Sequence, residues 1–146
     1  MNDMFQAQKY FDQAVNGVEK DSLFTLSLNG GEGKFGMLDI IDEYSGTPAA
    51  NLANYYAGTA YLRLKDYKNA IEHLNKFSSD DEILAPLAKG NIGDAFVQLN
   101  QLDDALDYYE QAAKMRDNDY TAPMYLYKAG TIALDLGKAD KALTYF

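Results

Sequence analysis

The sequence predicts an all-α fold built from a repeated pair of helices. Three glycines are each followed twelve residues later by an alanine, in the pairs Gly58 and Ala70, Gly93 and Ala105, and Gly130 and Ala142. The glycines are 35 and then 37 residues apart, and a short polar turn lies between each glycine and its alanine. Apolar residues around both recur every three or four positions, which is the period of an α-helix. We therefore expect successive helical hairpins.

Each glycine and alanine is expected where two antiparallel helices cross closely, because a larger side chain would hold the backbones apart. Larger residues one turn away would fill the space around the crossing. These residues are Tyr61 and Leu74 in the first hairpin, and Phe96 and Tyr109 in the second. The turns between paired helices are expected at residues 65–67, 100–102 and 137–139.

Composition excludes several kinds of protein. The chain has 146 residues, of which 47% are hydrophobic, with 12 Tyr and 7 Phe, so a folded domain is expected rather than a disordered chain. The absence of Cys excludes disulfides, thiolate metal sites and a Cys nucleophile, and the single histidine, His73, argues against a histidine metal site or a catalytic triad. A net charge of −9 disfavours nucleic acid and anionic lipid as partners.

Neither a signal peptide nor a membrane span is expected. The first ten residues lack a basic stretch followed by an apolar one, and no apolar run approaches the roughly 18–20 residues that cross a bilayer. We therefore expect a chain that is soluble as given and does not insert into a membrane directly.

The spacing of small and aromatic residues resembles the tetratricopeptide repeat (TPR) family, whose unit is a helix-turn-helix of 34 residues. Its small residues stand at the eighth and twentieth places, and aromatic residues at the eleventh and twenty-fourth. Counting from Asn51, Pro86 and Pro123 puts the three glycines at the eighth place and the three alanines at the twentieth. The chain departs from the pattern at the fourth place, where Trp is usual, and at Phe77, where Ala is usual.

Counting back by one repeat predicts a degenerate unit from Gly17, with a small residue at Gly36 and a proline at Pro48, and both residues are present. The resemblance therefore implies a right-handed α-α superhelix forming a single TPR-like domain over residues 1–146. We expect an N-terminal helix over 3–16, a degenerate repeat over 17–50, repeats over 51–85 and 86–122, and a partial repeat over 123–146.

In this family the first helix of each hairpin lines a concave groove that binds peptides or partner helices. The resemblance implies eleven groove residues in this chain: Tyr55, Tyr56, Thr59, Arg63, Asn91, Asp94, Gln98, Met124, Tyr127, Lys128 and Thr131. Packing between hairpins remains an equal alternative for Tyr55 and Tyr127, because a buried Tyr needs only one polar outlet.

Residues 31–36 match the glycine pattern of a dinucleotide site, and residues 22–28 before them alternate in polarity as a strand does. Such a site needs an acidic residue about 20 residues further on, where residues 50–56 contain none. A phosphate-binding loop would need Ser or Thr where Phe35 stands and Gly where Leu28 stands. We therefore expect no nucleotide and no other cofactor.

Acidic residues are expected at helix starts rather than in a metal or catalytic site. Residues 80–82 precede one predicted helix, and Asp103 and Asp104 fall in the first turn of another, where carboxylates are favoured by the unpaired amides. His73 is expected to be a half-exposed structural residue. No nucleophile stands beside a base, so the sequence predicts a protein that is not an enzyme.

One TPR subclass clamps the C-terminal carboxylate of chaperones. The five clamp places hold Tyr55, Thr59, Asn91, Met124 and Lys128, of which only Asn91 matches, with Lys128 in place of an Arg. A clamp without most of its cations loses its charge-assisted hydrogen bonds, so chaperone tails are disfavoured. Residues 38–47 and 53–58 look instead like bacterial membrane-anchored TPR proteins of the YfgM type, which are associated with the inner-membrane translocon.

We therefore expect a non-catalytic interaction scaffold that binds a peptide or partner helix of another protein. The YfgM resemblance implies the soluble part of a bacterial envelope protein, in the cytoplasm or the periplasm. The alternative is a structural module that self-assembles into a homo-oligomer through its C-terminal end. That alternative is based on the last predicted helix, which begins near Ala139 and has about two turns, too few to cover the hairpin before it.

Overall fold

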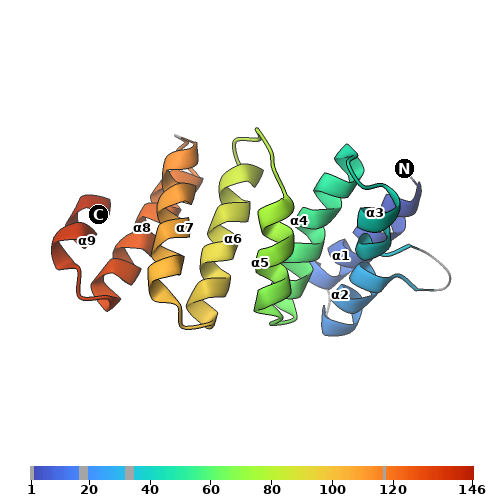
Figure 1. The fold of residues 1–146 in the computed structure, drawn as a ribbon, viewed down its shortest axis with the longest axis horizontal. Helices are drawn as coiled ribbons and strands as arrows, with labels where there is room; N and C mark the ends of the chain where they lie inside the picture. Colours follow the sequence, from blue (N-terminus) through green and yellow to red (C-terminus); the bar gives the residue numbers. More distant parts are fainter. Residues whose placement is uncertain (1, 17–19, 32–34, 117) are drawn as a thin grey trace. The chain divides into compact units, whose positions relative to one another are not determined.

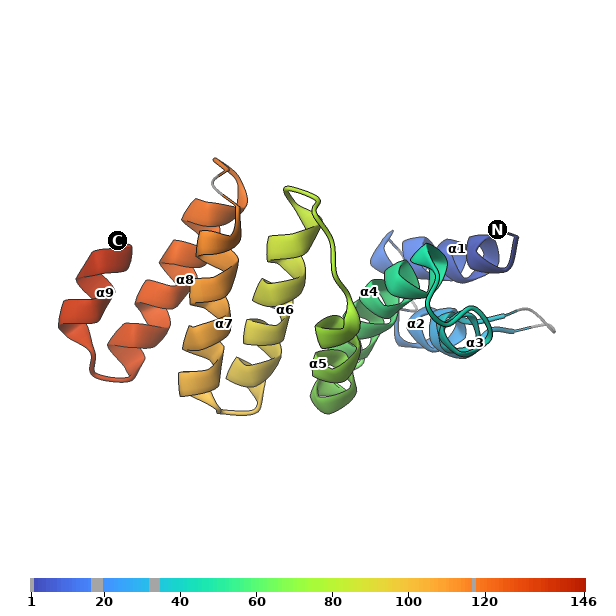
Figure 2. The ribbon, with the colours of Figure 1, turned by 45° about the horizontal axis from the view of Figure 1, so that its top comes forward.

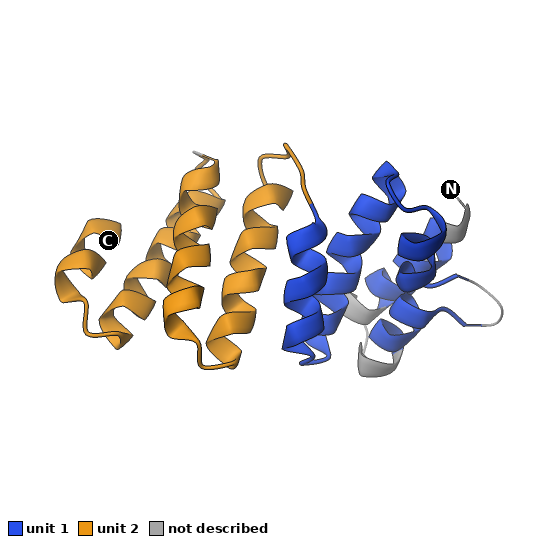
Figure 3. Ribbon diagram, in the orientation of Figure 1, with its two compact units in different colours: residues 1–77 blue, residues 78–146 orange. Residues whose placement is uncertain are grey.

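The computed structural model describes residues 2–16, 20–31, 35–116 and 118–146. These residues form nine α-helices and no strand, which confirms the predicted all-α fold of helical hairpins. The chain divides into two compact units, unit 1 over residues 1–77 and unit 2 over residues 78–146 (Figure 3). Each unit is described by itself below.

Unit 1 contains five helices: α1 (Asn2–Asn16), α2 (Lys20–Asn29), α3 (Met37–Glu43), α4 (Pro48–Arg63) and α5 (Tyr67–Lys76) (Figure 1). Helix α4 packs against each of the other four helices. Its small residues make close packing possible, since Ala53, Ala57 and Ala60 are fully buried in the core of the unit. Phe24, Met37 and Ile40 fill that core from α2 and α3.

The expected degenerate repeat contains two short helices, α2 and α3. Gly36 precedes α3, and its amide donates a hydrogen bond of 2.9 Å to Asp39 Oδ2. A Cβ atom at Gly36 would collide with the backbone of Leu28 and Gly30, so this position requires glycine. Residues 22–28 are helical, which removes the strand that a dinucleotide motif would need. The expected repeat start at Gly17, and residues 32–34 of the glycine motif, lie outside the described residues.

Unit 2 contains four helices that follow one another side by side: α6 (Leu84–Gln98), α7 (Leu102–Met115), α8 (Thr121–Asp135) and α9 (Ala139–Tyr145) (Figure 2). Its core combines alanines with larger residues from α7 and α8, chiefly Leu106, Tyr109, Tyr125 and Ile132. Each helix packs against its neighbours in the sequence.

The three turns between paired helices share one geometry. Lys65, Asn100 and Gly137 have φ angles of 66°, 57° and 74°, the left-handed conformation that ends a helix. The amide of the residue after each donates a hydrogen bond to a carbonyl five residues earlier: Asp66 to Tyr61, Gln101 to Phe96 and Lys138 to Ala133, at 2.8–2.9 Å. These bonds confirm the turns expected from the sequence.

The helix crossings also follow the sequence. A Cβ atom at Gly58 would lie 2.5 Å from Leu74 Cγ, and one at Gly93 would lie 2.7 Å from the ring of Tyr109. Each glycine therefore makes room for the large residue of the partner helix, which confirms the roles expected of Leu74 and Tyr109. Phe146 covers Gly130 in the same way.

Among the described residues, none of the helices combines the length and the apolar character needed to cross a bilayer. The division into one domain with the repeat limits given above stays a prediction. The two compact units meet in sequence at residues 77 and 78, between α5 and α6.

Candidate functional site

All eleven expected groove residues lie on the first helix of a hairpin. The structure brings them together as two sets, one in each unit. Unit 1 holds four of them on α4: Tyr55, Tyr56, Thr59 and Arg63. Unit 2 holds the other seven on α6 and α8: Asn91, Asp94, Gln98, Met124, Tyr127, Lys128 and Thr131.

In unit 1, Tyr56 packs between helices. Its ring centroid lies 4.9 Å from that of Phe11 on α1 in an edge-to-face contact. Its hydroxyl accepts a hydrogen bond of 3.2 Å from Gln8 Nε2, also on α1. Tyr56 is half-buried and joins α1 to α4.

Tyr55 and Thr59 are half-buried, and Arg63 is exposed. The Tyr55 ring lies 5.1 Å from that of Phe77. Burial raises the pKa of Tyr55 above its ordinary value, although the Thr59 side chain opposes the shift. The exposed part of this set is therefore mainly Arg63 and the edges of Tyr55 and Thr59.

In unit 2, Asp94 is the centre of a polar cluster that joins three helices. Its Oδ1 accepts hydrogen bonds from the Tyr109 hydroxyl on α7 and from Lys128 Nζ on α8, the latter at 2.9 Å. Lys128 Nζ also lies 5.7 Å and 5.8 Å from the ring centroids of Tyr109 and Tyr125. Burial, and then the bond to Asp94, raise the pKa of Tyr109, so that its hydroxyl stays protonated.

The Asp94 cluster limits what Lys128 can bind. The positive charge of Lys128 is compensated by Asp94 and by two aromatic faces, so it offers little to an incoming carboxylate. The geometry therefore agrees with the weak match to a chaperone-tail clamp. Asn91, the one matching clamp residue, is half-buried on α6.

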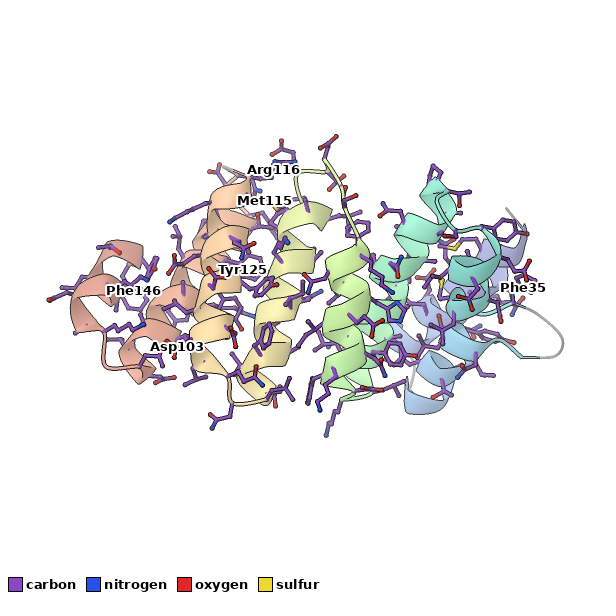
Figure 4. All side chains as sticks on the ribbon, viewed as in Figure 1. Phe35, Asp103, Met115, Arg116, Tyr125 and Phe146 are labelled. Carbon is purple, nitrogen blue, oxygen red and sulfur yellow. The ribbon has the colours of Figure 1, made fainter. Side chains whose placement is uncertain are left out.

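The remaining expected residues of unit 2 are more open. Tyr127 is 67% exposed, and Gln98 and Thr131 are also exposed, while Met124 is half-buried. The Tyr127 ring contacts Phe146 at 5.9 Å between centroids. The Phe146 ring, labelled in Figure 4, lies against α8, where it covers Gly130. Tyr127 is therefore largely exposed, and its place in a groove stays a prediction.

A second polar cluster was not predicted from the sequence. Glu110 on α7 accepts a hydrogen bond from the Tyr145 hydroxyl, and its Oε1 lies 3.0 Å from Lys141 Nζ. Lys138, just before α9, has its Nζ 3.3 Å from Oδ1 of Asp103 on α7. Asp94 and Lys128 are separated by 34 residues, and Asp103 and Lys138 by 35. A search for opposite charges one repeat apart would have found both pairs.

The acidic residues near helix starts behave as expected. Asp81 Oδ1 accepts hydrogen bonds of 2.8 Å from the amides of Ile83 and Leu84, and these bonds hold the pKa of the carboxyl below its ordinary value. Asp103 and Asp104 lie in the first turn of α7. In the part of the chain that the structure describes, no group of three or more acidic or histidine side chains is placed to hold a metal.

His73 is half-buried and paired inside unit 1, as expected of a structural residue. Its Nδ1 lies 2.9 Å from Asn54 Oδ1, and its ring stacks on Tyr61 with centroids 5.4 Å apart. Burial lowers the pKa of His73, and the nearby charge of Lys76 lowers it further. The neutral ring therefore completes the contact between α4 and α5.

The comparisons with known proteins agree with this architecture. Two solved structures of MamA AMB-1, in the crystal forms C2221 and P212121, are similar to the chain with TM-scores of 0.57 and 0.55 and sequence identities of 17% and 15%. They cover 97% and 99% of this chain, which covers 93% and 88% of them. At such identities the likeness shows the fold alone, and no curated protein matches the sequence.

A model of the tetratricopeptide repeat family matches residues 39–81 and 91–146. The two stretches include the hairpins α4–α5 and α8–α9 in full and most of α6–α7, with the helix crossings and turns described above. Because they make up more than half of the sequence, the chain belongs to the tetratricopeptide repeat family.

Proposed function

We propose that the chain binds a peptide or partner helix of another protein on the first-helix face of unit 2, formed by α6 and α8. The tetratricopeptide repeat fold supports a protein-interaction scaffold in general. The finer proposal is carried by one observation, the exposure of 67% of Tyr127 on α8 beside Met124 and Thr131. A large aromatic side chain with one polar tip is the kind of residue that dominates interfaces.

The composition of this face favours a ligand segment with little net charge. Lys128 is neutralised by Asp94, and the other expected residues on α6 and α8 are neutral. Tyr127 and Met124 would contact apolar side chains, while Asn91 and Gln98 offer hydrogen bonds to a peptide backbone. A strongly acidic or basic ligand would find no free opposite charge among these seven residues.

The test compares Tyr127→Ala with a matched control, Tyr120→Ala. Tyr120 is 68% exposed in the same unit but lies just before α8, outside the expected groove residues. Peptides selected by the intact chain from a displayed random library would be titrated by calorimetry. We expect Tyr127→Ala to weaken binding about tenfold or more, as truncation of an interface anchor does, and Tyr120→Ala to leave it unchanged.

Two outcomes would contradict the proposal. Equal losses from both substitutions would mean that the peptides bind by nonspecific aromatic contact. A melting temperature lowered by Tyr127→Ala by more than a few degrees would instead assign Tyr127 to the packing of the hairpin. Both substitutions remove the same side chain at nearly the same exposure, so each outcome is directly interpretable.

The proposal includes a scaffold without catalysis and a place in the bacterial envelope. The first part is supported by acidic residues that serve caps and ion pairs, and by the structural role of His73. The second part depends on the resemblance of residues 38–47 and 53–58 to YfgM-type proteins. Fractionation of cells that produce the full-length protein, followed by immunodetection, tests it: recovery in the soluble cytosolic fraction alone would refute an envelope location.

A further inference from the structure

An Asn–Gly pair ends helix α2 in unit 1. Gly follows Asn at residues 16–17 and 29–30 of the sequence, and the second pair lies within the described residues. An asparagine loses its side-chain amide most readily before glycine, because glycine has no side chain to hinder attack of its nitrogen on the asparagine. Asn29 is exposed, so water can reach it. Asn29 is therefore a candidate site of covalent modification.

The reaction is a ring closure followed by hydrolysis. The backbone nitrogen of Gly30 loses its proton and attacks Cγ of Asn29, while the bond from Cγ to Nδ2 breaks and Nδ2 takes up a proton and leaves as ammonia. Water then opens the resulting cyclic imide at either of its two carbonyl groups. One opening gives an aspartate at position 29. The other gives an isoaspartate, whose backbone runs through Cβ and Cγ and is longer by one carbon atom.

The folded end of α2 opposes this ring closure at both reacting groups. The Gly30 amide donates a hydrogen bond of 2.7 Å to the Leu26 carbonyl, and the φ angle of Gly30 is 79°, as in a left-handed helix cap. The leaving Nδ2 of Asn29 donates a hydrogen bond of 3.3 Å to the Thr25 carbonyl. Both bonds must break before the two groups can meet. Ring closure therefore requires local opening of the last turn of α2.

The peptide bond between Asn29 and Gly30 also packs closely on Gly36, just before α3, and we call this contact the α2–α3 junction. A Cβ atom at Gly36 would lie 2.5 Å from the carbonyl carbon of Asn29 and would also collide with the Gly30 nitrogen. The Gly36 amide is held in turn by a hydrogen bond of 2.9 Å to Asp39 Oδ2. The junction thus has no room for another carbon atom, and a backbone lengthened at position 29 does not fit it.

We propose that Asn29 is a gated deamidation site, which reacts when the α2–α3 junction opens and whose isoaspartate product keeps the junction open. A chain that has opened is thereby marked permanently, whereas the folded chain protects its labile amide. The aspartate product acts more weakly, because it adds only a negative charge at the carboxyl end of α2, where the helix dipole disfavours it. The site uses none of the residues of the proposed peptide-binding face, so the two proposals are tested separately.

The first experiment measures the gate. The intact chain and a synthetic peptide of residues 24–31 are incubated in a slightly alkaline buffer, with and without urea. Amide loss at position 29 is followed by mass spectrometry of digests. Without urea, we expect the intact chain to react at least about tenfold more slowly than the peptide, and in denaturing urea we expect the two rates to agree. Equal rates without urea would overturn the proposal.

Two helix-cap variants locate the gate. Asp39→Ala removes the hydrogen bond that holds Gly36 and should speed amide loss about fivefold. Asp81→Ala, which removes the carboxylate that caps α6 in unit 2, is the matched control and should leave the rate unchanged. Both carboxylates are exposed, and circular dichroism checks that each variant remains folded. An equal effect of the two variants, or none from Asp39→Ala, would contradict a gate at the junction.

The last experiment tests what the product does. The isoaspartate form of the chain is isolated by ion exchange and identified with an isoaspartate-specific methyltransferase. Its amide hydrogen exchange is compared with that of Asn29→Asp, which has the same added charge without the extra carbon. We expect exchange in α2 and α3 to be at least about tenfold faster in the isoaspartate form, and no more than about threefold faster in Asn29→Asp. Equal exchange in the two would overturn the proposal.

Discussion

The hairpins α4–α5 in unit 1 and α6–α7 in unit 2 share a register but fill it with different chemistry. In the first, Asn54 contacts His73, and the His73 ring stacks on Tyr61. A shift of 35 residues converts these three into Lys89, Tyr108 and Phe96. There Lys89 Nζ lies 5.6 Å from the ring centroid of Tyr108, which stacks on Phe96 at 5.5 Å. A hydrogen bond has been exchanged for a cation–π contact.

The comparison separates what the fold requires from what it tolerates. The glycine at the crossing and the left-handed turn residue are backbone requirements, and both hairpins meet them. The pair that closes the hairpin needs only two side chains that fill the gap and satisfy each other's polar atoms. Repeats of this family can therefore diverge in contacts while keeping their spacing.

Gly90→Ala is expected to have the largest effect on stability, because a Cβ atom there would lie 1.9 Å from Cζ of the Tyr125 ring. The equivalent residue of α4 is Tyr55, whereas Gly90 is covered by the ring of Tyr125, which is 2% exposed and cannot move aside. Overpacking there should lower the free energy of unfolding by about 2 kcal/mol, even though Ala favours a helix over Gly. Urea denaturation measures the loss.

A double-mutant cycle sharpens this expectation. In a Tyr125→Ala background the space beside Gly90 is open, so Gly90→Ala should become neutral or slightly stabilising. A cost that persisted in that background would show that Gly90 is needed for its own backbone and not for contact with Tyr125.

Much of the fold could be predicted because small residues and turn residues recur at regular intervals in the sequence. The spacing of Gly58, Gly93 and Gly130 located three crossings and three turns, and Gly36 was found by counting back one repeat. The α2 segment was harder to read, since residues 22–28 alternate in polarity like a strand. Phe24, Ser27 and Leu28 are buried together on one face of the helix. The polar Ser27 belongs to that face because its hydroxyl donates a hydrogen bond of 2.8 Å to the Ala7 carbonyl, and a polar residue at a buried position hides the helical period in the sequence.

The candidate site was less predictable, because a repeat position does not fix the direction in which a side chain makes its contacts. Tyr56 and Tyr127 were both expected in the groove, yet Tyr56 packs on Phe11 of α1, while Tyr127 is largely exposed. The difference arises from a neighbour, α1, that is not part of the repeat. The Asp94 cluster likewise depends on two partners, one a single repeat away.

Asp94→Ala should lower the free energy of unfolding by less than Gly90→Ala does. A larger loss would mean that the Asp94 cluster holds unit 2 together. The substitution leaves the hydroxyl of buried Tyr109 and the ammonium of Lys128 without their shared acceptor, which should cost about 1–2 kcal/mol. The matched change in unit 1, Asn54→Ala, removes the contact with His73. Because the half-buried His73 ring can form a hydrogen bond with water instead, the free energy of unfolding should fall less in this variant. Parallel urea denaturation of both variants gives the difference. A larger loss for Asn54→Ala would reverse the comparison.

Lowering the pH should have the smallest effect on the free energy of unfolding. The groups responsible in the two units should act in different pH ranges. In unit 1 the pKa of His73 is lowered, by burial first and then by Lys76, so the unfolded chain takes up the proton more readily. The free energy of unfolding should therefore fall slightly as the pH drops through the ordinary range of histidine, and His73→Gln should remove that slope.

In unit 2 the corresponding group is Glu110. Its burial opposes ionisation, but the bonds from Tyr145 and Lys141 and the charges of Lys141 and Lys114 outweigh burial and hold its pKa below the ordinary value. The stability that these contacts give is present above the glutamate range and is lost as the pH falls through the lowered pKa. Glu110→Gln should therefore change the pH dependence only at lower pH than His73→Gln does. Urea denaturation at closely spaced pH values measures both slopes, and overlap of the two would mean that the contacts of α9 with Glu110 do not persist in solution.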